Sequence, residues 1–333
     1  MTFDDLIGQP AAKEALRRGL RAGRLPSSLL FGGPEGVGKR PFALAVAQAL
    51  NCPVAPAEGC GECRSCWRIE RGEHPDVRLV APDGAQIKIG QAREAIQFVV
   101  SAPFEGRRRV LIVERADAFN AAAANALLKT LEEPPAHAQI ILVSARPDAL
   151  PATIRSRCPM VRFGLLTPAE VERCLERQGK RPPDDLRFLA RLAQGRPGAV
   201  AGLDLEAYRQ QRRIALELLD LLGQGGAVAR LLKAAGYFGK LERPEFEAAL
   251  SLLAGLLRDL ACLKAGAAAD DQSANLLIHA DIRAKLQAIA DRFTLERLHR
   301  ALSRFEAIRR ALNRNINRVL AMEAALLDLT SGS

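Results

Sequence analysis

The chain has 333 residues, of which 48% are hydrophobic and 26% are charged, so we expect a globular protein of two or three compact units. Its formal net charge of +10 favours contact with polyanions. No run of 18 apolar residues occurs, and Met1–Asp5 lacks both a basic leader and a following apolar core, which argues against a membrane-spanning chain and predicts a cytoplasmic one.

The first motif is a glycine-rich loop between a short apolar strand, Leu29–Phe31, and an amphipathic helical pattern, Pro41–Leu50. The loop reads Gly33-Pro34-Glu35-Gly36-Val37-Gly38-Lys39-Arg40. Its glycines, Gly33, Gly36 and Gly38, predict backbone N–H groups that surround phosphate oxygens, and Lys39 predicts a cation at the β- and γ-phosphates. A glycine-rich turn with a chance lysine is the alternative.

This loop departs from the usual pattern at its last residue. The pattern G-x-x-x-x-G-K continues with Ser or Thr, whose hydroxyl binds Mg²⁺, but Arg40 stands there. A guanidinium group cannot ligate a metal cation. We therefore expect that ATP or ADP can bind, whereas hydrolysis is impaired.

Four cysteines follow the loop helix closely: Cys52, Cys60, Cys63 and Cys66 are separated by seven, two and two residues. In the expected cytoplasmic compartment, structural disulfides are disfavoured, whereas four thiolates on two tight turns complete a tetrahedral zinc shell. The spacing predicts a structural Zn²⁺ site. A redox C-x-x-C pair and the replacement of one cysteine ligand by His74 are the alternatives.

A second departure follows the apolar run Val110–Val113. Strands of this kind in nucleotide hydrolases end in an acidic pair that holds the metal and orients the attacking water. Here the pair reads Glu114-Arg115, so a cation replaces one carboxylate. Together with Arg40, this change predicts that the chain alone is not an efficient ATPase.

The first half of the chain predicts a parallel α/β sheet, and the second half predicts helices only. The expected strands are Leu29–Phe31, Val77–Val80, Val110–Val113, Ile140–Ser144 and Met160–Phe163. A helix start follows, with Thr167 as N-cap, Pro168 as first residue and Glu170 as capping-box partner. We expect an α/β domain over 1–164 with a Cys₄ module at 52–66, a small helical domain over 165–206 and an all-α domain over 207–333.

Arginines gather at three places, and either contact with DNA or a solvated surface explains them. No aromatic residues interleave with them, which argues against a stacking platform for single strands. The three groups are Arg17, Arg18, Arg21 and Arg24; Arg107, Arg108 and Arg109; and Arg304, Arg309, Arg310, Arg314 and Arg318.

Two further strings identify a resemblance. Residues 125–135 read N-A-L-L-K-T-L-E-E-P-P, and residues 156–158 read Ser156-Arg157-Cys158. With the phosphate loop and the cysteine module, these strings resemble the bacterial clamp-loader subunits of the AAA+ superfamily, strongly from Phe3 to Phe163 and more loosely beyond. The resemblance implies that 1–164 is an AAA+ nucleotide-fold domain, 165–206 its lid and 207–333 a collar domain for oligomerisation.

Two subunit types in this family carry the same motifs, the ATP-hydrolysing gamma/tau type and the delta-prime type of DNA polymerase III. Arg40 and Glu114-Arg115 favour the delta-prime type, and Asn313–Asn317 resembles delta-prime C-terminal helices. The resemblance implies gamma/tau and delta subunits, the sliding clamp (beta) and primed DNA as partners. DNA-directed DNA polymerase activity would belong to the holoenzyme through another subunit.

The resemblance also implies roles for single residues. Arg157 would act in trans as a catalytic residue on the ATP of a neighbouring gamma/tau subunit, with Arg155 assisting its placement; a forked, permanent cation suits that task. A surface arginine near a helix end is the alternative. Ile7–Gln9 would lie near an adenine pocket, and Arg196 would be a second sensing arginine. Only Ser144 stands where a polar γ-phosphate sensor is expected.

Two other functions compete with a non-hydrolysing clamp-loader subunit. The first is a divergent gamma/tau-like ATPase that uses Glu114 as its metal carboxylate. ATP turnover by the lone protein that Lys39→Ala abolishes would favour it. The second is a zinc-dependent nucleic-acid-binding protein with a relic nucleotide fold, for which salt-sensitive DNA binding by residues 1–163 would be expected.

Overall fold

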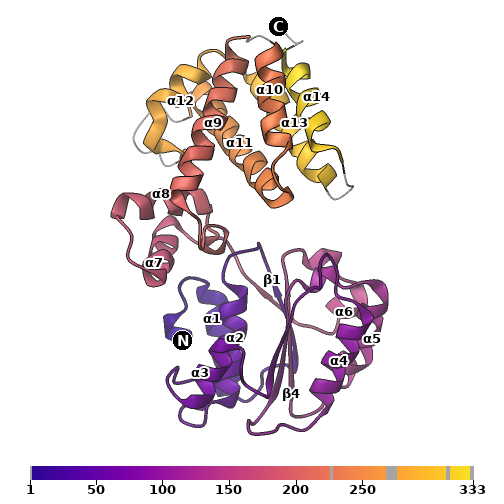
Figure 1. Cartoon of the computed structure of the whole chain (residues 1–333). Coiled ribbons are helices and arrows are strands. Elements are labelled where there is room, and N and C mark those ends of the chain that lie inside the picture. The colour runs from indigo at the N-terminus through magenta and orange to yellow at the C-terminus, as the bar shows by residue number, and fades with distance from the viewer. Residues whose placement is uncertain (1, 226–227, 268–275, 313–315, 331–333) are drawn as a thin grey trace. The chain divides into compact units, whose positions relative to one another are not determined.

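The structure, a computed structural model, describes residues 2–225, 228–267, 276–312 and 316–330 (Figure 1). It divides into two compact units, the first formed by Met1–Pro182 with Ala193–Ala201 and the second by Pro183–Leu192 with Gly202–Ser333. The predicted small helical domain, 165–206, is thus shared between the two units. The division into three domains stays a prediction.

The first unit is built on a parallel five-stranded sheet in the order β2-β3-β4-β1-β5. The α/β fold predicted for the first half is confirmed, and each strand falls where an apolar run predicted one. The strands are β1 (Ser28–Gly32), β2 (Val77–Val80), β3 (Arg109–Val113), β4 (Ala138–Ser144) and β5 (Met160–Arg162).

Helices cover both faces of this sheet (Figure 1), which explains why its central strands are continuous apolar runs rather than alternating ones. On one face lie α1 (Pro10–Arg21), α2 (Lys39–Asn51) and α3 (Arg64–Arg71). On the other face lie α4 (Ile89–Val100), α5 (Ala121–Glu132) and α6 (Ala152–Arg155). Short 3-10 turns occur at Phe3–Asp5, Ala116–Ala118, Pro147–Ala149 and Pro197–Ala199.

The parallel sheet brings three distant segments to one edge. The phosphate loop follows β1, Glu114 follows β3, and Ser144 ends β4, which pairs with both of those strands. The carboxyl ends of parallel strands share an edge, and ligands in α/β folds bind there. The candidate site therefore lies at this edge.

One helix of the small predicted domain belongs to the first unit. Helix α7 (Pro168–Gln178) begins as its sequence predicts: the Glu170 backbone N–H donates to the Thr167 hydroxyl at 3.3 Å, and the Thr167 N–H donates to the Glu170 carboxylate at 2.8 Å. Its Pro168 occupies the first helical position.

The described residues of the second unit form helices joined by short connections and contain no strand, which confirms the all-α prediction for the C-terminal half. Its core is rich in leucine, and α10 (Val228–Gly239) packs on α14 (Arg318–Thr330) as α11 (Arg243–Lys264) packs on α13 (Leu295–Ala311). None of the helices in the described ranges has the length and apolarity that a bilayer crossing requires. The helices are α8 (Pro183–Ala193), α9 (Leu205–Gly223), α10 (Val228–Gly239), α11 (Arg243–Lys264), α12 (Arg283–Ala290), α13 (Leu295–Ala311) and α14 (Arg318–Thr330), with a 3-10 turn at Ala280–Ile282. Residues 313–315 of the string 313–317 lie outside the described residues.

Candidate functional site

The backbone conformation of the phosphate loop requires glycine at positions 36 and 38. Gly36 and Gly38 have φ values of 81° and 100°, where other residues are strained, and Gly38 is the N-cap of α2. The loop is also held from outside, because the Gly198 N–H donates to the Gly36 carbonyl oxygen at 2.9 Å. Arg196 lies beside the same glycine, since a Cβ on Gly36 would be 3.4 Å from the Arg196 Cβ.

The side chain of Lys39, at the end of the phosphate loop, folds back onto the loop backbone. Its side chain is almost wholly buried, and its ammonium group donates to the carbonyl oxygens of Gly33 at 2.6 Å and Pro34 at 2.5 Å. Burial lowers the pKa of this ammonium group below its usual value. An ammonium group has three donors, so one remains for an anion next to the loop.

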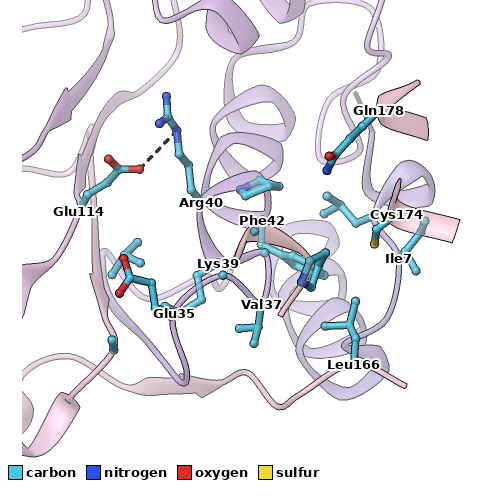
Figure 2. A pocket seen from close by; sticks show the side chains of 18 of the residues that line it. Ile7, Glu35, Val37, Lys39, Arg40, Phe42, Glu114, Leu166, Cys174 and Gln178 are labelled. Atoms are coloured by element: carbon cyan, nitrogen blue, oxygen red, sulfur yellow. Dashed lines mark ion pairs between the residues drawn. The ribbon is translucent and has the colours of Figure 1, made fainter. Parts of the chain in front are cut away.

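Arg40, the departure in the phosphate loop, contacts Glu114, the acid that remains after β3. The Arg40 Nε lies 3.3 Å from a Glu114 carboxylate oxygen, although 74 residues separate them in the chain (Figure 2). Arg40 provides no hydroxyl for a metal, and the one carboxylate that β3 offers is paired with a guanidinium group.

Ser144, the expected γ-phosphate sensor, is buried and already engaged. Its hydroxyl donates to Asp117 at 2.9 Å, and its oxygen accepts the Arg146 backbone N–H at 3.0 Å. Burial raises the pKa of Asp117, but hydrogen bonds from Ser144 and Arg146 outweigh burial and hold that pKa below its usual value. Ser144 therefore has no free hydroxyl proton for a bound phosphate.

A cavity of about 480 Å³ opens beside the loop. Figure 2 shows Glu35, Arg40 and Glu114 toward one side of it and Ile7, Cys174 and Gln178 toward the other. Ile7, expected near an adenine pocket, lines the cavity wall. Gln9 does not line it and instead binds the backbone of Gly164, just after β5. Its side-chain amide donates to the Gly164 oxygen at 2.7 Å and accepts the Gly164 N–H at 2.9 Å.

Arg157 follows the short helix α6 and is partly exposed. Its guanidinium group donates to the Thr153 carbonyl oxygen at 2.8 Å and to the Ser156 hydroxyl at 3.3 Å, and it forms an ion pair with Glu132 at the end of α5. The group is thereby held on a defined side of α6. Arg155 is paired with Asp148 instead, at 3.3 Å.

The four predicted cysteine ligands come together. Their sulfur atoms all lie within 4.8 Å of one another, with 3.6 Å between Cys52 and Cys60, 3.8 Å between Cys52 and Cys63, and 4.0 Å between Cys60 and Cys66. A tetrahedral zinc–thiolate shell has sulfur–sulfur edges of about 3.8 Å, so the cluster fits this metal. Backbone N–H groups of Cys63 and Glu62 hold the pKa of Cys60 down at about 6.

His74, the alternative ligand, is occupied elsewhere. Its Nδ1 accepts the Asp76 backbone N–H at 3.1 Å, and its Nε2 lies 3.1 Å from the Ser65 hydroxyl. Burial lowers the pKa of the imidazole. Both ring nitrogens are therefore engaged by Ser65 and Asp76, and the geometry favours the four-thiolate set.

Many of the clustered arginines are paired with acids inside the chain. Arg17 contacts Asp4 at 2.7 Å, Arg21 contacts Glu58 at 2.5 Å, and Arg304 contacts Asp328 at 2.8 Å. These pairs reduce the positive charge that the clusters present to a polyanion. Direct contact with DNA stays a prediction.

Comparison with known proteins gives the family. The family model described as "DNA polymerase III, delta subunit" matches residues 8–167, and its C-terminal counterpart matches residues 207–331. Subunit delta' of DNA polymerase III from Bacillus subtilis is 30% identical over 97% of both chains. The same subunit from Pseudomonas aeruginosa is 32% identical over 94% of both chains. The chain belongs to the delta-prime family of DNA polymerase III subunits.

The gamma/tau proteins are relatives over a shorter span. The tau subunit from Escherichia coli is 37% identical to this delta-prime family member over 201 residues, which are 58% of this chain and 31% of tau. The family expected from the phosphate loop, the cysteine module and the two strings is therefore confirmed.

Sequence reasoning missed the partners of the functional residues. It singled out Arg40, Glu114 and Arg157, but it did not foresee that Arg40 would contact Glu114 or that Glu132 would hold Arg157. One signal was present, because residues 40 and 114, both at positions that bind the metal in hydrolases, carry opposite charges. Glu132 gave no separate signal, since it lies within a string that served only for recognition.

Proposed function

We propose that this chain is a non-hydrolysing clamp-loader subunit, a stator that holds geometry while other subunits turn over ATP. It would assemble with gamma/tau and delta subunits through its helical C-terminal part and support the loading of the sliding clamp on primed DNA. Family membership supports the assignment. The observation that carries the absence of hydrolysis is the contact between Arg40 and Glu114, because Arg40 stands where a metal-binding hydroxyl is expected and pairs with the carboxylate that would hold the metal.

The second part of the proposal assigns Arg157 a catalytic role in trans. A guanidinium group that meets the γ-phosphate of ATP on a neighbouring gamma/tau subunit stabilises the charge of the transition state. The partial exposure of Arg157 and its fixed position beside α6 support this role. In this role Arg157 acts on ATP bound to the neighbouring subunit, so this chain need not hydrolyse ATP itself.

The third part assigns a structural zinc ion to Cys52, Cys60, Cys63 and Cys66. Bound zinc would supply a closed cross-link between the end of α2 and the start of α3, with no coordination position left for catalysis. The distances among the four sulfur atoms support the assignment. Backbone N–H groups of Ala55 and Cys60 already point at the Cys52 sulfur, at 3.2 and 3.4 Å.

The test is ATP turnover by a complex reconstituted with gamma/tau, delta, clamp and primed DNA. Arg157→Ala should lower turnover by about a thousandfold while assembly, measured by gel filtration, is unchanged. Arg93→Ala, an exposed arginine on α4, is the matched control and should leave turnover unchanged. Unchanged turnover with Arg157→Ala would remove the role in trans. Turnover by the isolated chain that Lys39→Ala abolishes would favour a gamma/tau-like ATPase instead.

A further inference from the structure

The phosphate loop of this chain does not fit the Mg²⁺ ion that such loops share with bound nucleotide. The ion takes a hydroxyl ligand from the residue after the loop lysine and a carboxylate from the neighbouring strand. Here Arg40 replaces the hydroxyl, and its Nε lies 3.3 Å from the Glu114 carboxylate. A divalent cation at this position would meet a guanidinium group and would have to displace it.

We propose that this loop binds a nucleoside diphosphate or triphosphate without a divalent cation, with the Arg40 guanidinium group in the place of the metal. A metal ion in a phosphate site neutralises phosphate charge and fixes the direction of the chain of phosphates. A guanidinium group does both through charge-assisted, forked hydrogen bonds. The proposal concerns the site of this chain alone and does not rest on Arg157.

The charged groups around the loop support this assignment. Arg40 uses its Nε toward Glu114, which leaves the four N–H donors of its two terminal nitrogens for an anion. Its side chain is 55% exposed, so phosphate oxygens can reach it. Lys39 is the opposite case: it is buried and held on two loop carbonyl oxygens, so it contributes a charge at a fixed position in the cavity wall.

The shape of the cavity supports a nucleotide rather than a free phosphate. Its volume of about 480 Å³ falls within the range of small-molecule sites. In Figure 2 the side chains of Arg40 and Glu114 lie on one side, and those of Ile7 and Cys174 lie on the other. A polyphosphate at the charged side would place a base near the apolar side, where Leu166 also lines the wall.

The proposal predicts how Mg²⁺ changes the nucleotide affinity of this chain. In a loop with its hydroxyl and free carboxylate, Mg²⁺ strengthens nucleotide binding because the protein ligates it. In this chain Mg²⁺ gains no ligand, and Mg²⁺-bound nucleotide carries less charge for Arg40 and Lys39 to attract. Nucleotide affinity should therefore be the same or weaker when Mg²⁺ is present.

The experiment is calorimetric titration of the full chain with ADP and with a slowly hydrolysed ATP analogue, with and without millimolar Mg²⁺. Divalent cations should be removed by a chelating resin and not by EDTA, so that the cysteine module keeps any zinc. The native chain should bind ADP without Mg²⁺, and Mg²⁺ should not tighten the dissociation constant by more than about twofold. Arg40→Ala should weaken binding by about tenfold or more, because a hydrogen bond to a charged group is lost.

Two variants make the result specific. Arg24→Ala, an exposed arginine away from the cavity, should bind ADP as the native chain does. Arg40→Thr restores the hydroxyl and frees Glu114, so Mg²⁺ should now tighten ADP binding. Three results would overturn the proposal: no ADP binding by the native chain, binding that requires Mg²⁺, or native affinity in Arg40→Ala. Each of them would leave the role of Arg157 in the assembled complex untouched.

Discussion

Arg157 is held by a carboxylate of its own chain before any neighbour is present. Glu132 pairs with one end of the guanidinium group, and the Thr153 carbonyl oxygen accepts from the other. A side chain fixed at two points loses little conformational freedom when it meets a phosphate. We therefore interpret Glu132 as a positioning residue for the proposed donor.

Glu132→Gln tests this interpretation because it keeps the size of the side chain and removes its charge. In the reconstituted complex we expect ATP turnover to fall by about tenfold, as is typical when an aligned group loses its support, and KM to be unchanged. The double variant with Arg157→Ala should turn over no more slowly than Arg157→Ala alone, since both changes act through one group. Glu133→Gln is the neighbouring control; additive losses would show that Glu132 acts independently.

Asp76 is a second residue whose charge is satisfied inside the fold. Its carboxylate accepts the backbone N–H groups of Phe104, Glu105 and Gly106 at 2.6–2.9 Å and lies 3.3 Å from the Arg109 guanidinium group. Burial raises the pKa of Asp76, but these N–H donors and Arg109 outweigh burial and lower the pKa overall. The carboxylate thus stabilises the segment that leads into β3.

We expect Asp76→Asn to lower the free energy of unfolding at pH 7 by about 1.5–3 kcal/mol. The folded-state pKa lies below the unfolded value of about 3.9, so the charge contributes fully above that value and its contribution is lost as the pH falls through the folded pKa. In urea unfolding, the deficit of the variant should therefore be constant down to about pH 5 and shrink below about pH 4. Asp83→Asn, an exposed control, should cost little at any pH.

At the scale of elements, the cysteine module joins α2 to α3. Cys52 follows the last residue of α2, and Cys63 is the N-cap of α3, where its sulfur accepts the Cys66 N–H at 3.5 Å. With zinc bound, the intervening turns are closed by four bonds rather than by a large apolar core. The stability of α3 should therefore depend on the metal.

Metal analysis of protein purified without chelator should give about one zinc per chain, because four thiolates fill one tetrahedral shell. The chain has a single tryptophan, Trp67, which lies on α3 next to Cys66. Zinc removal should change its fluorescence, and zinc return should restore it. Cys60→Ser should lower the zinc content, whereas Cys262→Ser, in the second unit, should not. Full zinc content in Cys60→Ser would contradict the four-cysteine site.

The strands and the cysteine module could be predicted because burial and ligand chemistry each impose a pattern on neighbouring residues in the sequence. The strands are apolar runs because both faces of the sheet are covered, and the cysteine spacing is the one that four thiolates need to surround a single metal ion. Side-chain pairs were not predictable in the same way. Arg40 and Glu114 become neighbours only because β4 lies between β1 and β3, and that strand order is a property of the whole sheet.

At the scale of the whole molecule, the second unit has a stabilising cluster of its own. The Tyr208 hydroxyl lies 2.8 Å from the His279 Nε2, and the His279 Nδ1 lies 2.8 Å from the Asp259 carboxylate. Asp259 also accepts the backbone N–H groups of Ile278 and His279. Burial raises the pKa of Tyr208, so the phenol stays protonated at neutral pH.

This cluster tests whether the two units unfold separately. His279→Ala removes the imidazole that bridges the Asp259 carboxylate and the Tyr208 hydroxyl, while the two backbone N–H donors to Asp259 remain. It should lower the free energy of unfolding of the second unit by about 3 kcal/mol. Trp67 reports on the first unit only, whereas far-ultraviolet circular dichroism reports on the helices of both. On heating, the variant should lose helical signal at a lower temperature while the Trp67 transition stays at its native temperature. His299→Ala, exposed on α13, should leave both signals unchanged. A joint downward shift of both signals in His279→Ala would mean that the two units unfold as one cooperative structure.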